Sequence, residues 1–168
     1  MTQESYMIFR VGGRSCAVSV NYVLEVSESD NLSPLPGAPA FVVGIKKFRD
    51  EVLPIIDTVK RLSIPKVESE DQPNKYVVIF EIPTDSGTKR FGALVDKVLA
   101  VSEFANNNIK VIDEVDNNSK NAPYIKGVVN SDDGFIYVLI PDNFFTQKDF
   151  QRLDNVMPED FWVPPSFD

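Results

Sequence analysis

Histidine is absent from the 168 residues of the sequence, and cysteine occurs once, as Cys16. Without histidine there is no Ser-His-Asp or Cys-His nucleophilic site, no zinc site built on imidazole and no phosphohistidine carrier. A lone cysteine cannot form an internal disulfide, and its apolar neighbours favour a small buried side chain over a reactive thiol. We therefore expect no catalytic residues and no cofactor.

Basic charge is also scarce, since 17 Lys and Arg face 25 Asp and Glu, which gives a net charge of −8. Proteins that bind nucleic acid through their general surface need clustered cations to contact phosphates, so we expect no nucleic-acid partner. The densest basic stretches are Lys46-Lys47 with Arg49, and Lys60-Arg61. These stretches are short, but they can serve an acidic protein partner.

Long apolar runs are missing as well. No segment approaches the roughly 20 apolar residues that a membrane helix needs, and the first five residues lack the basic and apolar parts of a signal peptide. We expect a cytoplasmic protein.

Phosphate-binding glycine motifs are absent, and Gly12-Gly13 suits a tight hairpin turn instead. Acidic pairs do occur. Asp132-Asp133 precedes Gly134 between two expected strands, where a hairpin turn explains it better than a metal site. The group Asp113, Glu114 and Asp116 begins a polar run that favours a solvated loop. We expect no metal, although these acidic loops leave a small metal protein or enzyme as a less favoured alternative.

Short runs of β-branched and aromatic residues recur along the whole chain, and most are bounded by Gly, Pro, Asn or Asp. This spacing predicts an all-β protein with a few short helices. One helix is expected over residues 58–62 after Asp57, and another after Pro141, capped by Asp142 or Asn143. The expected strands cover residues 6–10, 16–20, 23–26, 52–56, 76–82, 91–95, 98–101, 125–129 and 135–140.

The two halves of the chain resemble each other. Residues 16–26 align without gaps on residues 91–101, and residues 38–44 are matched by residues 122–127 with one deletion. Two matches in the same order indicate a duplication. We expect two barrels packed side by side within one domain, 1–168.

The expected barrels are divided by the polar, proline-bracketed linker 63–74. The first barrel covers 16–62 and the second 75–145, with the strand over 6–15 as one that the two can share. A helix and tail occupy 146–168. The end of this tail holds Trp162, the one tryptophan, and is interpreted either as a clasp on a barrel or as a docking peptide.

The stretch Gly44–Asp57, preceded by Ala38–Val43, resembles the signature of the CheW-like family. That signature has a proline-led turn, a glycine, a strand ending in Asn-Leu-Arg-Gly and an apolar strand reading Val-Pro-Val-Val-Asp-Leu. The first strand and turn, Tyr6–Gly13, look like the family's opening, and Val23–Val26 looks like its Val-Gln-Glu-Ile. In the second half Gly92–Val98 looks like the family's Gly-Leu-Val-Val-Asp-x-Val.

The resemblance spans about residues 6–145 and implies a fold of two five-stranded, SH3-like barrels without enzymatic activity. It also implies an adaptor that bridges the cytoplasmic tips of chemoreceptors and the regulatory domain of a CheA-type histidine kinase. Such an adaptor would be cytoplasmic and recruited to membrane receptor arrays.

The matching positions supply candidate contacts. Arg49, with Lys47 and Phe48, corresponds to the family's receptor contact, while Val23, Glu25 and Gly44 fall on positions linked with kinase binding. From the residues alone, Glu25 suits either solubility or the rim of an interface, and Arg49 either a solvated turn or an interface.

The chain departs from the family where Lys47 and Asp50 replace the Asn and Gly of its arginine loop. This change motivates an alternative, a divergent CheW-like binding module in another motility or accessory signalling pathway, such as pilus-driven surface motility.

Overall fold

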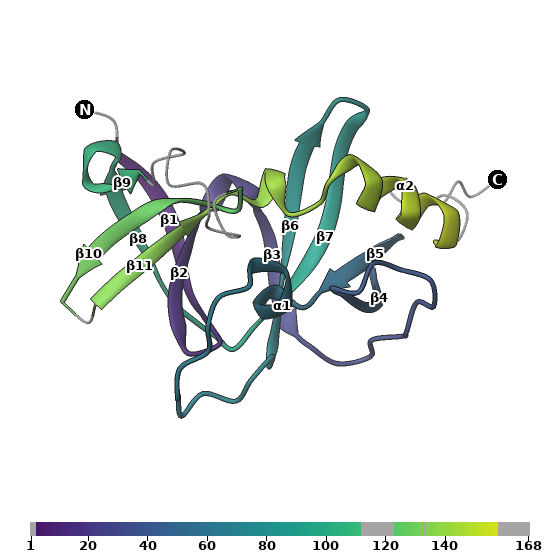
Figure 1. Cartoon of the computed structure of the whole chain (residues 1–168), viewed down its shortest axis with the longest axis horizontal. Coiled ribbons are helices and arrows are strands. Elements are labelled where there is room, and N and C mark those ends of the chain that lie inside the picture. Colours follow the sequence, from purple (N-terminus) through teal and green to yellow (C-terminus); the bar gives the residue numbers. More distant parts are fainter. Residues whose placement is uncertain (1–2, 112–122, 133, 158–168) are drawn as a thin grey trace.

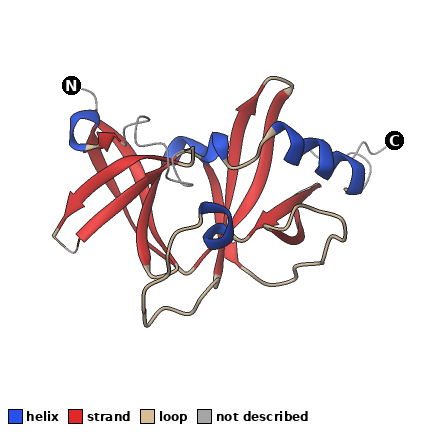
Figure 2. Ribbon diagram, in the orientation of Figure 1, coloured by secondary structure: helices blue, strands red, loops and turns tan. Residues whose placement is uncertain are grey.

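Strands make up most of the computed structural model, which describes residues 3–111, 123–132 and 134–157 (Figure 2). Every expected strand lies within or largely within an observed one, so the all-β class with short helices is confirmed. The strands are β1 (Gln3–Val11), β2 (Arg14–Ser19), β3 (Val23–Glu28), β4 (Val42–Phe48), β5 (Glu51–Ile56), β6 (Tyr76–Thr84), β7 (Gly87–Val95), β8 (Lys97–Ala105), β9 (Lys110–Val111), β10 (Ile125–Ser131) and β11 (Gly134–Leu139).

The strands form two sheets that lie side by side (Figure 1). One has six strands in the order β8-β1-β2-β11-β10-β9, and the other has five in the order β3-β6-β7-β5-β4. Pairing is antiparallel except for β2 with β11 and β5 with β7. The two curled sheets are consistent with SH3-like barrels, and the two-residue strand β9 extends the first beyond the expected five.

The two sheets do not follow the expected division into 16–62 and 75–145. The six-stranded sheet takes β1 and β2 from the first half of the chain and β8 to β11 from the second, while the five-stranded sheet takes β3 to β5 and adds β6 and β7. Each half thus contributes its first two strands to one sheet and the rest to the other. Similar apolar alternation in all strands gives no indication of this exchange, because strand partners are selected by long-range packing.

The duplication itself is visible in the strand order. The repeat makes β6, β7, β8, β10 and β11 of the second half equivalent to β1, β2, β3, β4 and β5 of the first. When each strand is exchanged for its equivalent, the order of one sheet becomes the order of the other, and only β9 has no counterpart. Strands β4 and β10 even share a register shift at the same place, just before Gly44 and Gly127. The two sheets are therefore related by an internal repeat whose halves interlock.

Three apolar clusters hold the fold together. The largest lies between the sheets and includes Phe9 and Cys16 from the six-stranded sheet and Phe80 and Phe91 from the five-stranded one. The other two fill the inside of each sheet, around Ala17 and Val138 in one and around Leu53 and Ile79 in the other. Because burial of apolar surface is the main favourable term in folding, the shared cluster makes the two sheets one cooperative unit.

The described residues also form two α-helices, α1 (Thr58–Leu62) and α2 (Gln147–Val156), and the 3-10 turns η1 (Val20–Tyr22), η2 (Asn106–Asn108) and η4 (Pro141–Asn143). The helix expected after Asp57 is present, and Asp57 caps it by accepting from the Lys60 N–H at 3.1 Å. The expected cap of the second helix is wrong. Its N-cap is Thr146, which forms a capping box with Asp149, since Pro141–Asn143 is used up in the 3-10 turn.

The segment 63–74 lies against the β1–β2 turn, and we call it the strap. The Val67 N–H donates to the Gly12 carbonyl at 2.9 Å, and Arg10 Nη1 lies 2.9 Å from Asp71 Oδ2. Ile64 is buried in the cluster between the sheets. The segment expected to be a linker is thus held against the fold by a hydrogen bond, an ion pair and a buried side chain.

Candidate partner-binding surfaces

The receptor-contact candidates lie at the tip of the β4–β5 hairpin. Lys47 and Arg49 are exposed, whereas Phe48 is only 6% exposed and packs inside the five-stranded sheet. The Arg49 guanidinium carbon lies 4.7 Å from the centroid of the Phe48 ring. The buried Phe48 ring therefore packs against the Arg49 guanidinium, and the side chains exposed to a partner here are those of Lys47 and Arg49.

The backbone at this tip is tightly turned. Phe48 pairs with Glu51, which leaves Arg49 and Asp50 as the loop. Arg49 adopts φ 56°, whereas Asp50 does not have a positive φ. The residue that replaces the family's glycine is thus in an ordinary conformation, so Asp50 changes the charge of the loop without straining it.

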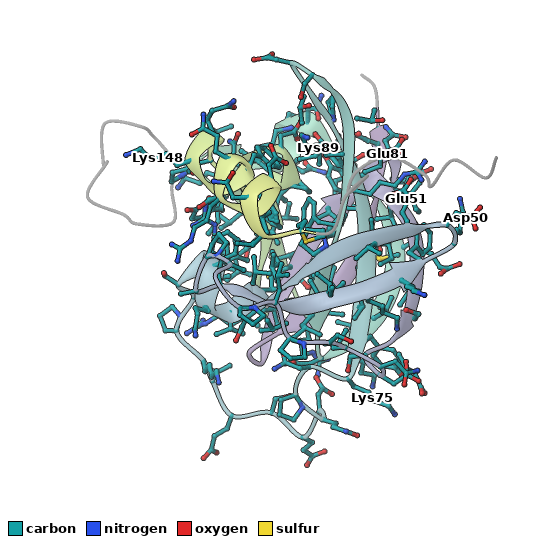
Figure 3. The ribbon with its side chains drawn as sticks, turned by 90° about the vertical axis from the view of Figure 1, so that its right-hand side faces the viewer. Asp50, Glu51, Lys75, Glu81, Lys89 and Lys148 are labelled. Atoms are coloured by element: carbon teal, nitrogen blue, oxygen red, sulfur yellow. The ribbon has the colours of Figure 1, made fainter. Side chains whose placement is uncertain are left out.

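Beneath the tip, Arg90 joins two carboxylates from neighbouring strands. Its Nη1 lies 2.5 Å from Glu51 Oε1 and its Nε 2.8 Å from Glu81 Oε2. Figure 3 shows Glu51 and Glu81 close to the hairpin that ends at Asp50. The hydrogen bond to Glu81 and the charges of both carboxylates raise the pKa of Arg90. This network fixes the base of the hairpin and so the direction in which Arg49 is presented.

The kinase-contact candidates lie on the two outer strands of the five-stranded sheet, β3 and β4. Glu25 is exposed, Val23 is half-buried, and Gly44 is buried. A Cβ at Gly44 would collide with the Ser33 carbonyl oxygen, because the chain crosses directly over this glycine. Gly127 is covered in the same way by Lys110. Gly44 therefore has a structural role that its repeat partner shares.

Contacts at the same crossing bring β3 and β4 together. Lys46 Nζ donates to the Glu28 carbonyl at 2.9 Å and to Asp30 Oδ1 at 3.3 Å, and Ser33 pairs with Ile45. These contacts close the side of the five-stranded sheet between its two outer strands. The structure thus places the surface around Glu25 and the hairpin that carries Arg49 on one barrel.

An apolar strip on the six-stranded sheet was missed by the sequence reasoning. Leu99 and Val101 on β8 are 37% and 62% exposed, and Phe135 on β11 is 59% exposed. The signal was available, because the run Val98–Val101 has four apolar residues in a row where a half-exposed strand should alternate. Leu99 and Val101 lie on the same face of β8, whereas β1 and β2 separate β8 from β11, which carries Phe135. Exposed apolar side chains that lie together, as on β8, mark a surface for protein contact.

Other candidates from the sequence play no part in these surfaces. Cys16 is fully buried, and burial raises the pKa of its thiol to about 12. Asp132 is exposed in the turn that joins β10 and β11, while Asp113, Glu114, Asp116, Asp133 and the 158–168 tail lie outside the described residues. Within the described ranges there is no group of three acidic, cysteine or histidine side chains placed to hold a metal. The helices described there are also too short to cross a membrane.

Taken together, a basic hairpin tip on one sheet and an apolar strip on the other define a two-barrel, SH3-like protein-binding module. The sequence matches the CheW-like domain over residues 5–149. The chain therefore belongs to the CheW-like family.

Known proteins agree with this assignment. The chain is 28% identical over 156 residues to the chemotaxis protein CheW of Treponema pallidum (strain Nichols), covering 92% of this chain and 89% of that protein. It is 30% identical over 99 residues to protein FrzA of Myxococcus xanthus, covering 59% and 58%. The crystal structure of the scaffolding protein TtCheW from Thermoanaerobacter tengcongensis has the same fold, with a TM-score of 0.70, 22% identity and coverage of 89% and 92%.

Proposed function

We propose that the protein is a non-catalytic adaptor that couples chemoreceptors to a CheA-type histidine kinase. The observation that carries the proposal is the match to the CheW-like domain over residues 5–149, together with relatives called chemotaxis protein CheW. The adaptor acts in the cytoplasm and is recruited to receptor arrays at the membrane through its partners. Its partners are the cytoplasmic tips of the receptors and the regulatory domain of the kinase.

The mechanism is geometric. An adaptor does no chemistry, so it affects the kinase only by holding receptor and kinase in a fixed relative arrangement. The receptor and kinase surfaces assigned below lie on the same five-stranded sheet, and the large apolar cluster packed against that sheet keeps the surfaces in register. A conformational bias in the receptor then reaches the kinase through a stiff connector.

The receptor contact is assigned to Lys47 and Arg49 at the hairpin tip. Because the chain carries a net charge of −8, this cationic tip is a distinct local feature that attracts an acidic segment of the receptor. Arginine forms bidentate contacts with carboxylates, and the Phe48 ring limits the freedom of Arg49 before binding.

The kinase contact is assigned to β3 and β4, with Val23 and Glu25 offered to the partner and Gly44 shaping the surface. Glu25 lies exposed beside half-buried Val23. An apolar patch with a charged residue at its rim is the usual arrangement in protein interfaces.

The receptor assignment is tested by Arg49→Glu, with Lys148→Glu as the matched control. Lys148 is exposed on α2, away from the hairpin tip, and the control makes the same change of charge (Figure 3). We expect Arg49→Glu to weaken binding to a receptor cytoplasmic fragment by about tenfold or more in calorimetry, a loss of about 1.4 kcal/mol, whereas the control binds normally. Unchanged binding of Arg49→Glu would show that the assignment is wrong.

The kinase assignment is tested by Glu25→Lys, with Glu103→Lys as its control on β8, the repeat equivalent of β3. Both glutamates are exposed, so neither change should unfold the protein. Weaker binding of the kinase regulatory domain by Glu25→Lys alone supports the assignment. If the unmodified protein binds neither receptor nor kinase, the proposed function itself fails.

A further inference from the structure

Asp96 is the single residue between β7, in the five-stranded sheet, and β8, in the six-stranded sheet. Here the chain crosses from one barrel to the other, on the side of the molecule where the strap lies (Figure 1). Asp96 is 6% exposed and is one of four buried polar or charged residues in the part of the chain that the structure describes. A buried carboxylate is costly unless it is well bonded, so its partners at this position need an explanation.

The partners of Asp96 come from both barrels. Its Oδ1 accepts from the N–H of Asn74, which precedes β6 in the five-stranded sheet, at 2.9 Å. Its Oδ2 accepts from the N–H of Gly13, in the β1–β2 turn of the six-stranded sheet, at 3.4 Å. Its own N–H donates to the Arg10 carbonyl of β1 at 2.8 Å. One side chain thus bonds the backbone of the two barrels at the point where they are joined.

Around Asp96, hydrogen bonds rather than apolar contacts hold the chain segments together. A cavity of about 400 Å³, lined by Gly13 and Asp96, lies beneath the strap, so apolar packing does not fill the space. Gly13 has φ 81°, and a Cβ there would collide with the Val67 carbonyl of the strap. Hydrogen bonds to a charged acceptor are about twice as strong as neutral ones and depend on direction, which makes them suited to fixing an angle.

The equivalent crossover in the first half of the chain lacks this arrangement. The position that aligns with Asp96 is Asn21, which is exposed and donates to Glu4 Oε1 at 3.4 Å. Glu4 belongs to β1, so this bond joins the crossover to the six-stranded sheet only. The repeat therefore provides a natural control, since two equivalent connections differ in whether a buried carboxylate bonds both barrels.

We propose that Asp96 is a positioning residue that fixes the orientation of the six-stranded barrel relative to the five-stranded barrel, which carries both assigned partner contacts. This inference goes beyond the proposed function and stands on the structure of the chain alone.

The test compares Asp96→Asn and Asp96→Ala with Asn21→Ala at the equivalent crossover. Spin labels are placed on cysteines introduced at Lys47 and Lys126, which are exposed on β4 and β10, one in each sheet. Electron–electron resonance should show a broadened or shifted distance distribution in both Asp96 variants and an unchanged one in Asn21→Ala. An unchanged distribution in folded Asp96→Asn would overturn the proposal.

A measurement on the unmodified protein covers the case in which the variants fold poorly. The amide protons of Gly13 and Asn74 should be protected from hydrogen exchange, because both donate to the buried carboxylate. Rapid exchange at both amides would also overturn the proposal.

Discussion

Arg61 on α1 and Asp149 on α2 form an ion pair, with Arg61 Nη2 2.9 Å from Asp149 Oδ2. The same guanidinium donates through Nε to the Phe144 carbonyl at 2.6 Å and lies 4.1 Å from the centroid of the Phe41 ring. Residues far apart in the sequence therefore meet at one side chain. Arg61 connects the end of each half of the repeat.

Replacing Arg61 by alanine should lower the free energy of unfolding by about 2–4 kcal/mol, because it removes charged hydrogen bonds and the packing over Phe41 together. Urea unfolding followed by circular dichroism measures the change. Lys60→Ala on the same helix is the control, since Lys60 is exposed and should change stability by less than about 0.5 kcal/mol. Equal effects of the two substitutions would rule out the role given to Arg61.

Gly44→Ala should destabilise the fold by about 1–3 kcal/mol, because the added methyl group has no room against the Ser33 carbonyl. Gly127→Ala should do the same against Lys110, as expected for repeat equivalents. Val43→Ala, at the exposed neighbour of Gly44, is the control for thermal unfolding. A Gly44→Ala protein of normal stability that no longer binds kinase would instead make Gly44 a direct contact.

Alkaline pH should destabilise the protein through Tyr6. Burial, followed by the charge of Glu4 and a hydrogen bond to it, raises the pKa of Tyr6 from 10.0 to about 12. The folded state holds this proton more tightly than the unfolded state, so the stabilisation is complete below pH 10 and is lost as the pH rises towards 12. Tyr6→Phe should flatten the fall in unfolding free energy over this range, and an unchanged slope would contradict the assignment.

Cys16 should resist thiol reagents in the native protein. Burial raises the pKa of its thiol from 9.0 to about 12, and the residue is fully enclosed. A chromogenic disulfide reagent at pH 8 should therefore label no thiol in buffer and one thiol per chain in concentrated urea, since the sequence has one cysteine. Fast labelling in buffer would show that the core between the sheets opens readily.

Local patterns in the sequence predicted elements well and their contacts less well. The strands were predicted because their apolar alternation is local, and the first helix was placed correctly because a helical pattern begins directly after Asp57. The second cap was placed too early, since Asp142 and Asn143 are also good capping residues. Asn143 instead donates to the Pro123 carbonyl at 2.7 Å, a partner that no local pattern reveals.

The candidate site shows the same division. Alternation along β4 makes Lys47 exposed and Phe48 buried, so the burial of Phe48 could have been inferred from the strand. The Arg90 network under the hairpin could not, because Glu51, Glu81 and Arg90 come from three strands whose pairing is not encoded locally. For the same reason the role of Asp96 becomes visible only once the sheets are known.

The exchange of strands between the halves has a bearing on how this chain arose. A single copy of the repeat would contain only the first two strands of one sheet and only the remaining strands of the other. Both sheets would then be incomplete, with unpaired edges. Two copies, each completing the other's sheets, would form a closed dimer with exchanged strands. Fusion of the two gene copies would turn that dimer into one chain and free its once-identical halves to diverge, so that one barrel could acquire binding surfaces that the other lacks.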